Sequence, residues 1–496
     1  MNLVAVDERS GARWHAAPRA PQSRRLARPP VVRERFEIGD QGDAGARQSD
    51  PERVQDEGFG ALDGIGRQIV EARRDGSFHE AESDVVGAVH RSLDATILDM
   101  SDAIRLSCAP PWSDAGQHAM SPVATHDDIA RFNFLANFNK YMASAVVAGN
   151  EVAFRTRAEP RWSATHGEAP VSRRDIRDAM SEDPYYRMWS SLRRTGMEMR
   201  QQAGRAMVLR QMQSLRDRAR ALNASQPESL QLDPTIAVPR YQSELDNHCM
   251  PGSYFAEYID DDVAAAANYD AGMFATTTGL FGRYLDGAGR GTADWLKRRR
   301  PNWAPRRILD LGAGLGHNVL PLARAFPAAE IVAVDLAAPM LRYGHARAIG
   351  MGIHNVVFQQ ANAERLPYED GRFDFIWSAM FLHETSHAAL RNILREAKRL
   401  LAPGGIQIHL EQPPYRGMSA FEQFLRDWDC QNNNEPFWSA LHESSLPSIM
   451  KELGIEGSKI FEVEIHALVE DEMPKVSSEV EDFGRGGLWY ACGAEA

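Results

Sequence analysis

A glycine-rich turn between an apolar strand and a helix constrains the fold of this 496-residue chain more than any other feature. The segment reads Ile308-Leu309-Asp310-Leu311-Gly312-Ala313-Gly314-Leu315-Gly316. Glycine permits positive φ angles and lets a ligand approach the backbone closely. In open α/β sheets, ligands bind in the crevice at the carboxyl ends of the strands. The segment therefore predicts a ligand-binding turn at the edge of such a sheet.

Strand and helix patterns alternate along the chain after Arg306. Short β-branched runs predict strands, and helical patterns begin between them near Asn318, Pro339 and His387. The predicted strands are residues 307–311, 330–335, 355–359, 373–378 and 405–410, followed by 459–467 and 487–493. This alternation is typical of a doubly wound parallel sheet. We therefore expect the α/β fold class, with a Rossmann-like sheet, in a domain over residues 246–496.

Residues 81–245 carry helical signals instead, and we expect an N-terminal all-helical accessory domain there. Three sets of residues are typical of helix starts, namely Thr125 with the acids that follow it, Ser172 with Asp175, and Asp183 before Pro184. The last start predicts one long polar helix that runs to about Leu222. Residues 223–239 are typical of a linker.

Composition narrows the possible partners and compartments. Residues 1–80 are predicted to form a disordered N-terminal tail, because the Arg-, Pro- and Gly-rich first 60 bury too little apolar surface to offset their ordering entropy. The formal net charge of −12 argues against nucleic acid as a partner. No apolar run is long enough to predict a membrane span, and no signal peptide precedes the tail, so we expect a cytoplasmic protein. The four cysteines lie far apart without a CxxC pair, which indicates neither a disulfide framework nor a zinc site.

Three details of the turn discriminate between ligands. His317 occupies the sixth position of G-x-G-x-x-G, where a dinucleotide site requires Gly or Ala for close helix packing. Asp310 lies two residues before the first glycine, where a carboxylate suits a cationic, amine-bearing ligand better than a pyrophosphate. Asp335 ends the next predicted strand and can accept hydrogen bonds from ribose hydroxyls. No GKS or GKT follows the turn, which excludes a Walker loop.

Together with four further segments, the turn resembles the class I S-adenosylmethionine-dependent methyltransferases. The similarity is greatest to small-molecule methyltransferases of the ubiquinone-biosynthesis type, and it covers roughly residues 250–496. The further segments are 334–341 with the second-strand acid, 361–368, which is similar to the family's adenine-contacting "DAExLPF", 371–378 at the fourth strand, and 400–405 before the fifth.

The resemblance implies S-adenosylmethionine as cofactor and in-line methyl transfer to a small-molecule acceptor. By position, it implies that Asp310 orients the amino group of the cofactor and that Asp335 holds the ribose. Asn362 stands where the family usually has Asp, but its side-chain carbonyl can still accept a hydrogen bond from adenine. The residues implied to bind the cofactor are Asp310, Gly312, Ala313, Gly314, Gly316, Asp335, Leu336, Asn362, Ala363 and Ser378.

A second motif, His383-Glu384-Thr385-Ser386-His387, matches the H-E-x-x-H pattern of zinc peptidases. That pattern requires a continuous helix, which places both histidines on one face. Thr385 and Ser386 are instead typical helix N-caps, so we expect a loop at this point and no metal site. His383, as a base or orienting group, and Glu384 are the candidate catalytic residues, and a packing role for a loop histidine remains the alternative. A base is needed only if the acceptor loses a proton.

Acceptor-binding candidates come from two parts of the chain. Those before the glycine-rich turn are His248, Tyr254 and Tyr269, and those after the fifth strand are Glu411, Trp428, Asn433 and Trp438. The two tryptophans are equally typical of a packed helical insertion. We expect a small-molecule substrate, no nucleic-acid or membrane partner, and a homodimer formed through the helical region.

Three other functions remain open at this point. The first is a macromolecule methyltransferase that acts on RNA or protein, for which the cations at residues 297–300, 306 and 307 are the only support. The second is a catalytically inactive methyltransferase-like binding module. The third is a zinc hydrolase that uses His383, Glu384 and His387.

Overall fold

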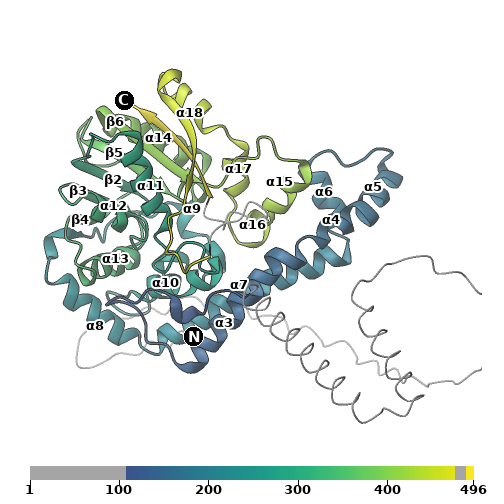
Figure 1. Ribbon diagram of the computed structural model, residues 1–496, viewed down its shortest axis with the longest axis horizontal. Helices are drawn as coiled ribbons and strands as arrows, with labels where there is room; N and C mark the ends of the chain where they lie inside the picture. Colours follow the sequence, from purple (N-terminus) through teal and green to yellow (C-terminus); the bar gives the residue numbers. More distant parts are fainter. Residues whose placement is uncertain (1–107, 475–487) are drawn as a thin grey trace, which may run out of the picture. The chain divides into compact units, whose positions relative to one another are not determined.

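The computed structural model describes residues 108–474 and 488–496, all of which belong to one compact unit (Figure 1). The predicted disordered tail at residues 1–80 lies outside the described residues, as does the start of the predicted helical region. Among the helices of the described residues, none is long and apolar enough to cross a lipid bilayer.

One eight-stranded sheet forms the centre of the unit, with the order β1-β4-β3-β2-β5-β6-β8-β7. All neighbouring strands are parallel except β8, which runs antiparallel between β6 and β7. This order confirms the predicted α/β fold with a doubly wound sheet. The strands are β1 (Leu230–Gln231), β2 (Arg307–Leu311), β3 (Glu330–Asp335), β4 (Val356–Gln360), β5 (Phe373–Ala379), β6 (Leu401–Glu411), β7 (Ile460–His466) and β8 (Leu488–Glu495).

The shortest strand, β1, was not predicted. It lies inside the expected linker at residues 223–239 and pairs with β4 at the edge of the sheet. Two residues are too few to show the period-two pattern on which strand prediction depends. The pairing is therefore decided by the neighbouring strand and not by local sequence.

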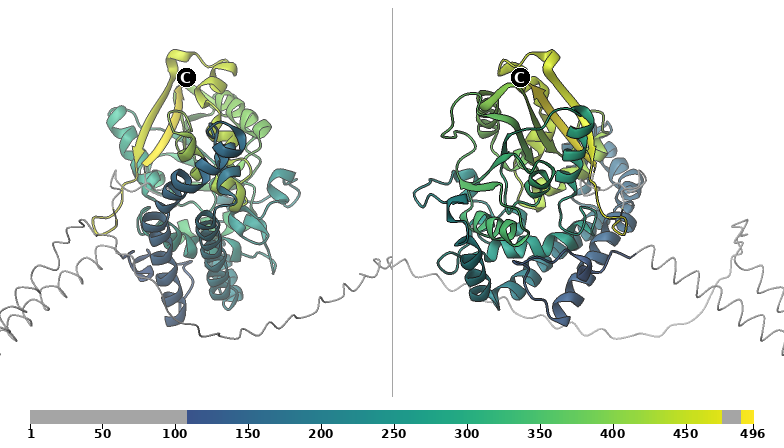
Figure 2. Two further views of the ribbon diagram at one scale, coloured as in Figure 1. Left: turned by 90° about the vertical axis from the view of Figure 1, so that its right-hand side faces the viewer. Right: turned by 60° about the vertical axis from the view of Figure 1, so that its left-hand side comes forward.

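Helices cover both faces of the sheet, which explains why its central strands are almost continuously apolar. Successive residues of β2 belong to different cores: Ile308 packs into one and Leu309 into the other. The first core is closed by α11 (Gly287–Arg299), α12 (Val319–Ala325) and α13 (Ala338–Gly350), and the second by α14 (His387–Leu400) and α18 (Leu446–Glu452). Figure 2 shows these layers from two further directions.

The three predicted helix starts in the N-terminal region are confirmed. Thr125 and Ser172 form capping boxes with Asp128 and Asp175, and Asp183 accepts a hydrogen bond from the Tyr185 N–H. The helices of this region are α3 (His126–Tyr141), the π-helical η2 (Met142–Val146), α4 (Gly149–Ala153), η3 (Phe154–Ala158), α5 (Glu159–His166), α6 (Arg173–Met180), α7 (Pro184–Leu209), α8 (Met212–Asn223) and α9 (Arg240–Ser243).

The prediction of one helix from Pro184 to about Leu222 is wrong, because α7 ends at Leu209 and α8 starts at Met212. The break lies at Gln211, whose φ of −126° is not helical. The Gln211 side-chain amide bonds both the N–H and the C=O of Val123. These contacts to a distant loop replace the helical geometry at this residue.

The helical region shares cores with the rest of the unit. One core combines α3, α7, α8 and α13 with α10 (Ala264–Thr277). Another joins α7 to the insertion after β6, which comprises α15 (Ala420–Arg426), α16 (Trp428–Asn432) and α17 (Trp438–Glu443) (Figure 1). Within it, the Trp189 and Trp428 rings meet edge to face, and Arg193 pairs with Asp429 at 3.0 Å.

Helix α11 reaches the glycine-rich turn through a face of small residues. The Gly289 N–H donates to the Asn318 side chain at 3.1 Å. A Cβ added at Gly289 would lie 2.1 Å from the backbone oxygen of Asn318. Only a residue without a side chain allows α11 to lie this close to the segment that follows the turn.

We expect Gly289→Ala to lower the free energy of unfolding by about 2–3 kcal/mol, since the clash is with backbone and the neighbours must shift to relieve it. Urea and thermal unfolding would measure the change. Arg298→Ala, an exposed position of the same helix, is the matched control, with an expected effect within about 0.5 kcal/mol. Equal stability of Gly289→Ala and the wild type would contradict the packing argument.

Candidate functional site

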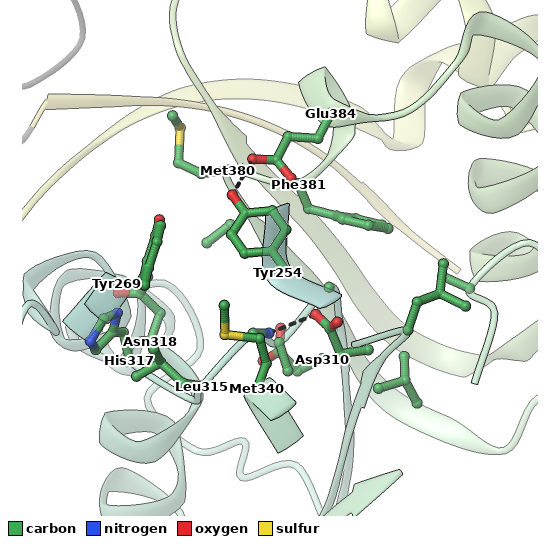
Figure 3. Close-up of a pocket in the computed structure, with 18 of the residues that line it drawn as sticks. Tyr254, Tyr269, Asp310, Leu315, His317, Asn318, Met340, Met380, Phe381 and Glu384 are labelled. Carbon is green, nitrogen blue, oxygen red and sulfur yellow. Dashed lines mark hydrogen bonds between the residues drawn. The ribbon is translucent and has the colours of Figure 1, made fainter. Parts of the chain in front are cut away.

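A cavity of about 220 Å³ lies at the carboxyl ends of the central strands (Figure 3). Its walls come from the glycine-rich turn, the residues after β3, β4 and β5, and the helical segments that precede β2. The predicted site residues that line it are Asp310, Gly312, Ala313, Gly314, Asp335, Leu336, Asn362, Ala363, His383, Glu384, His248, Tyr254 and Tyr269. The fold therefore brings eight of the ten predicted cofactor-binding residues, both catalytic candidates and three of the acceptor candidates to one cavity.

The glycines of the turn serve different purposes. Gly312, Gly314 and Gly316 have φ angles of 72°, 54° and 83°, a region that disfavours other residues. A Cβ on Gly312 would overlap the Phe381 ring, whereas a Cβ on Gly314 would meet nothing within 4 Å. Gly316 faces Phe358 and does not line the cavity. Gly314 thus leaves backbone open to a ligand, and the other two permit packing.

Asp335 connects the glycine-rich turn to the start of α13. Its Oδ2 accepts a hydrogen bond from the Gly314 N–H at 2.8 Å, and its Oδ1 accepts one from the Ala337 N–H, also at 2.8 Å. Burial raises the pKa of Asp335 to about 6, although these backbone hydrogen bonds oppose the rise. The carboxylate is therefore held in place at the cavity wall by two segments.

Asp310 is the second buried acid at this end of the cavity, and only 4% of it is exposed. Burial and, after it, the nearby charge of Asp335 raise the pKa of Asp310 well above its ordinary value. Two neighbouring acids do not easily both lose their protons, because the two negative charges repel each other. A cation bound between or beside them stabilises both as carboxylates. This end of the cavity therefore favours a ligand that carries positive charge.

Asn362 lines the cavity beside Ala363, and its Oδ1 accepts a hydrogen bond from the Glu364 N–H at 2.9 Å. A carbonyl oxygen has two lone pairs, so one acceptor position remains. Two residues before Asn362, at the end of β4, the Gln360 side chain donates to the Leu336 carbonyl at 2.9 Å and fixes the segment after β3.

His383 belongs to the 3₁₀ turn η7 (Leu382–Glu384), and α14 begins only at His387 after Ser386 as N-cap. The two histidines of the H-E-x-x-H motif therefore do not share a helical face, as a zinc peptidase would require. His383 Nδ1 instead pairs with Glu411 Oε2 at 2.7 Å, and each side chain is 1% exposed. Burial lowers the pKa of His383, but the Glu411 carboxylate outweighs it and raises that pKa to about 9.

Glu411 organises the segment that carries His383. Its other oxygen, Oε1, accepts hydrogen bonds from the Phe381 and Leu382 N–H groups at 3.0 and 2.6 Å. The sequence placed Glu411 only among several candidates after the fifth strand. Its contact with the segment after β5 could have been predicted from its position, because it ends β6, which lies beside the end of β5 in the parallel sheet.

The acceptor candidates before the turn form a polar cluster with Glu384. Tyr254 Oη donates to Glu384 Oε1 at 2.7 Å, as Figure 3 shows, and His248 Nε2 lies 3.2 Å from the same oxygen. The Tyr254 and Tyr269 rings meet edge to face with centroids 5.7 Å apart. Burial first, and then the charge of Glu384, raises the pKa of both tyrosines, which keeps them neutral.

Six predicted site residues lie away from the cavity wall, namely Gly316, Ser378, Glu411, Trp428, Asn433 and Trp438. Ser378 is buried in β5 and bonds His409 at 2.8 Å, because its side chain points into the sheet layer. Trp428 packs in the helical core around α7. Asn433 and Trp438 contact site residues instead: Asn433 bonds His248 at 3.2 Å, and Trp438 packs against the His383 ring.

Cavity residues that the sequence did not predict include Gln242, Met273, Met380, Phe381 and Trp489. They come from four separate segments and carry no local pattern. His317, noted only as an obstacle to dinucleotide binding, lines the cavity and lies 2.7 Å from Asp270. Asp270 also bonds His118 and Tyr343, so this carboxylate joins the first described segment, α10 and α13 to the turn.

Comparison with known proteins gives matches to methyltransferases. A family model described as a methyltransferase domain matches residues 308–405. The demethylmenaquinone methyltransferase of Thermus thermophilus is 41% identical over 111 residues, which are 22% of this chain and 49% of that protein. A ubiquinone/menaquinone biosynthesis C-methyltransferase of Pseudomonas savastanoi is 37% identical over 111 residues, 21% of this chain and 41% of that protein. The chain thus spans less than half the length of these curated relatives.

A solved structure among the matches is phosphoethanolamine N-methyltransferase 2 of Haemonchus contortus in complex with S-adenosyl-L-methionine. It is 20% identical, covers 46% of this chain and 57% of its own, and has a TM-score of 0.33.

The cavity residues fit S-adenosylmethionine. That cofactor carries an ammonium and a sulfonium group, which suit the buried pair Asp310 and Asp335. Gly314 presents backbone without a side chain toward the cavity, and Leu336, Asn362 and Ala363 supply apolar and amide surface beside it. Asp310 and Asp335 would hold the charged and ribose portions, and the segment at residues 362–363 would face the base.

We expect Asp335→Ala and Gly314→Val to weaken S-adenosylhomocysteine binding by about 10- to 100-fold. The first removes the charged acceptor that holds the turn and the ribose, and the second fills the cavity and strains a backbone at φ 54°. Isothermal titration calorimetry would measure the dissociation constants. Asp370→Ala, an exposed acid, should bind like the wild type. Absence of binding by the wild type would refute the cofactor site.

Proposed function

We propose that this chain, whose residues 308–405 form a class I S-adenosylmethionine-dependent methyltransferase domain, methylates a small aromatic molecule that bears an ionisable hydroxyl group. The observation that carries the proposal is the shared cavity. Gly314 and Asp335, which we propose bind the cofactor, line one cavity of about 220 Å³ together with His383, whose ring is held by Glu411.

The walls of the acceptor end support an aromatic, uncharged acceptor. Tyr254, Tyr269, Phe281, Phe381 and Trp489 line the cavity. Among the described residues that line the cavity, none is Lys or Arg. A phosphate or carboxylate on the acceptor would therefore find no Lys or Arg there, and the His248 and His383 rings are already paired with Glu384 and Glu411. A neutral ring would find apolar and π surface.

The relatives support the same class of acceptor. Those reported above are described as methyltransferases of demethylmenaquinone and as C-methyltransferases of ubiquinone and menaquinone biosynthesis. The family model matches residues 308–405 and does not cover the residues that precede β2. We infer that the identity of the acceptor depends on His248, Tyr254 and their neighbours, which line the cavity outside the matched segment.

Transfer requires alignment more than covalent catalysis, because the sulfonium of the cofactor supplies an already activated methyl group. The residues of this chain bind and orient the cofactor and the acceptor, and they exclude water. Asp310 and Asp335 hold the cofactor end, and the aromatic side chains at the other end fix the plane of the acceptor ring. Burial of the cavity among three cores keeps bulk water from competing for the methyl group.

His383 takes the proton that the acceptor hydroxyl loses. Its Nδ1 is held by Glu411, which leaves Nε2 as the nitrogen that exchanges a proton with the acceptor. A pKa raised to about 9 lies close to that of an ordinary phenol, about 10, so the transfer is nearly balanced in free energy. Glu411 acts through His383 and is a positioning residue.

We expect kcat/KM for methylation of a hydroxyarene to rise with pH through about 9, as His383 loses its proton and becomes a base. Glu411→Gln removes the charge that raises the His383 pKa, so the rising limb should move to lower pH by one unit or more, with a lower plateau. His383→Ala should lower kcat/KM about 100-fold or more, and its pH profile should lack the rising limb. Formation of S-adenosylhomocysteine from a panel of phenols, catechols and hydroquinones is the readout.

Glu452→Gln, an exposed position, is the control and should keep the wild-type pH profile. An unchanged limb in Glu411→Gln would refute the dyad. Tight S-adenosylhomocysteine binding without turnover of any hydroxyarene would favour a binding module or another class of acceptor.

A further inference from the structure

Three donor side chains converge at the acceptor end of the cavity. They are His248 from η5 (Asn247–Cys249), Glu384 from η7, and Glu435 from the connection between α16 and α17. One candidate ligand atom from each lies within 4.8 Å of the other two. His248 Nε2 is 3.2 Å from Glu384 Oε1, and His248 Nδ1 is 2.8 Å from Glu435 Oε1. We call these three residues the His-Glu-Glu cluster.

The cluster is shielded from solvent. Its side chains are 20%, 12% and 2% exposed for His248, Glu384 and Glu435 respectively. Two carboxylates thus share one imidazole in a largely buried place. Burying carboxylates is costly unless cations or hydrogen bonds compensate them.

The Glu435 carboxylate has a partner for only one of its two oxygens among the described residues. Its Oε2 is buried and has no hydrogen-bond partner among the described residues. Such atoms are rare in folded proteins and need an explanation, of which a bound ion is one. This is a second observation, independent of the clustering, that indicates a missing partner at this point.

The surrounding contacts hold the donors in position. Tyr254 Oη donates to Glu384 Oε1 at 2.7 Å, and Asn433 Nδ2 lies 3.2 Å from His248 Nδ1. Gln242 Nε2 donates to the Glu384 backbone carbonyl at 2.7 Å. Outer contacts of this kind orient metal ligands and fix their rotamers. The cluster therefore has both donors and the supporting hydrogen bonds that a metal site needs.

The spacing also suits one ion. Ligand atoms bound about 2.1 Å from a first-row ion, at angles of about 90–110°, lie roughly 3.0–3.4 Å apart. The His248–Glu384 contact of 3.2 Å falls in that range. Glu435 now contacts the other ring nitrogen, so it must turn to reach an ion at Nε2. Its unpartnered Oε2 is the oxygen that this movement would use.

We propose that His248, Glu384 and Glu435 bind one divalent first-row transition-metal ion. An imidazole with two carboxylates favours Mn²⁺, Fe²⁺, Co²⁺ or Zn²⁺ over Mg²⁺ and Ca²⁺, which prefer oxygen alone. Three protein ligands leave open coordination positions. His248 and Glu384 line the cavity, so those positions face the space of the acceptor. The proposal goes beyond the methyltransferase function and does not require an identified acceptor.

Metal content and binding test the proposal directly. The full chain, treated with chelator and dialysed, is titrated with Co²⁺ while the visible d–d absorption is recorded, and with Mn²⁺ and Zn²⁺ by calorimetry. We expect one equivalent of metal per chain. Glu435→Gln and His248→Ala should each weaken binding at least 10-fold, because each removes one of three ligands.

Matched controls are Glu168→Gln and His126→Ala, which alter exposed side chains outside the cluster and should bind metal like the wild type. S-adenosylhomocysteine binding reports folding, and Glu435→Gln should retain it because Glu435 does not line the cavity. Substoichiometric Co²⁺ binding by the wild type, or equal binding by Glu435→Gln, would overturn the proposal. Neither result depends on turnover, so failure of the metal site and failure of the proposed methylation are distinguished.

Discussion

The carboxylate of Asp335 joins the glycine-rich turn to the start of α13, and the cavity depends on both segments. Asp335 ends β3 and accepts hydrogen bonds from the Gly314 and Ala337 N–H groups. Parallel pairing of β2 with β3 brings the glycine-rich turn next to this residue, and Gly312 and Ala313 both donate to the Val334 carbonyl. The turn can therefore stay open toward the cavity at Gly314 while its backbone remains bonded to the neighbouring strand.

A second carboxylate extends this arrangement into the helices. Asp270 of α10 bonds His317 after the turn, His118 in the first described segment, and Tyr343 of α13. Burial opposes its ionisation, but the charge of His118 and the hydrogen bonds outweigh burial and hold the pKa of Asp270 well below its ordinary value. Burial lowers the pKa of His317 to about 4, which keeps that ring neutral beside the cavity. The helices before the sheet thus take part in forming the cofactor end.

The segment that carries His383 is organised by Glu411 and by the insertion after β6. Glu411 orients His383 with one oxygen and the Phe381–Leu382 backbone with the other, while the Phe381 ring covers Gly312. The insertion packs on α7 through Trp189 and Trp428, and its connection carries Glu435 to His248. Two predicted acceptor contacts lie away from the cavity wall: Trp428 packs the insertion into the helical core, and Asn433 contacts His248 of η5.

The sequence alone determined the α/β fold class, the seven longer strands, the helix caps at Thr125, Ser172 and Asp183, and the cofactor turn with Asp310 and Asp335. These features depend on local chemistry. Strands follow from the spacing of apolar residues, the turn from glycines that permit positive φ angles, and helix caps from side chains that bond the nearby backbone. Only the tertiary structure decided the break at Gln211, the edge strand β1, and the pairing of His383 with Glu411 and of His248 with Glu384 and Glu435. Each of these joins groups that are tens to hundreds of residues apart, and no local pattern records a contact that forms only when distant elements pack together.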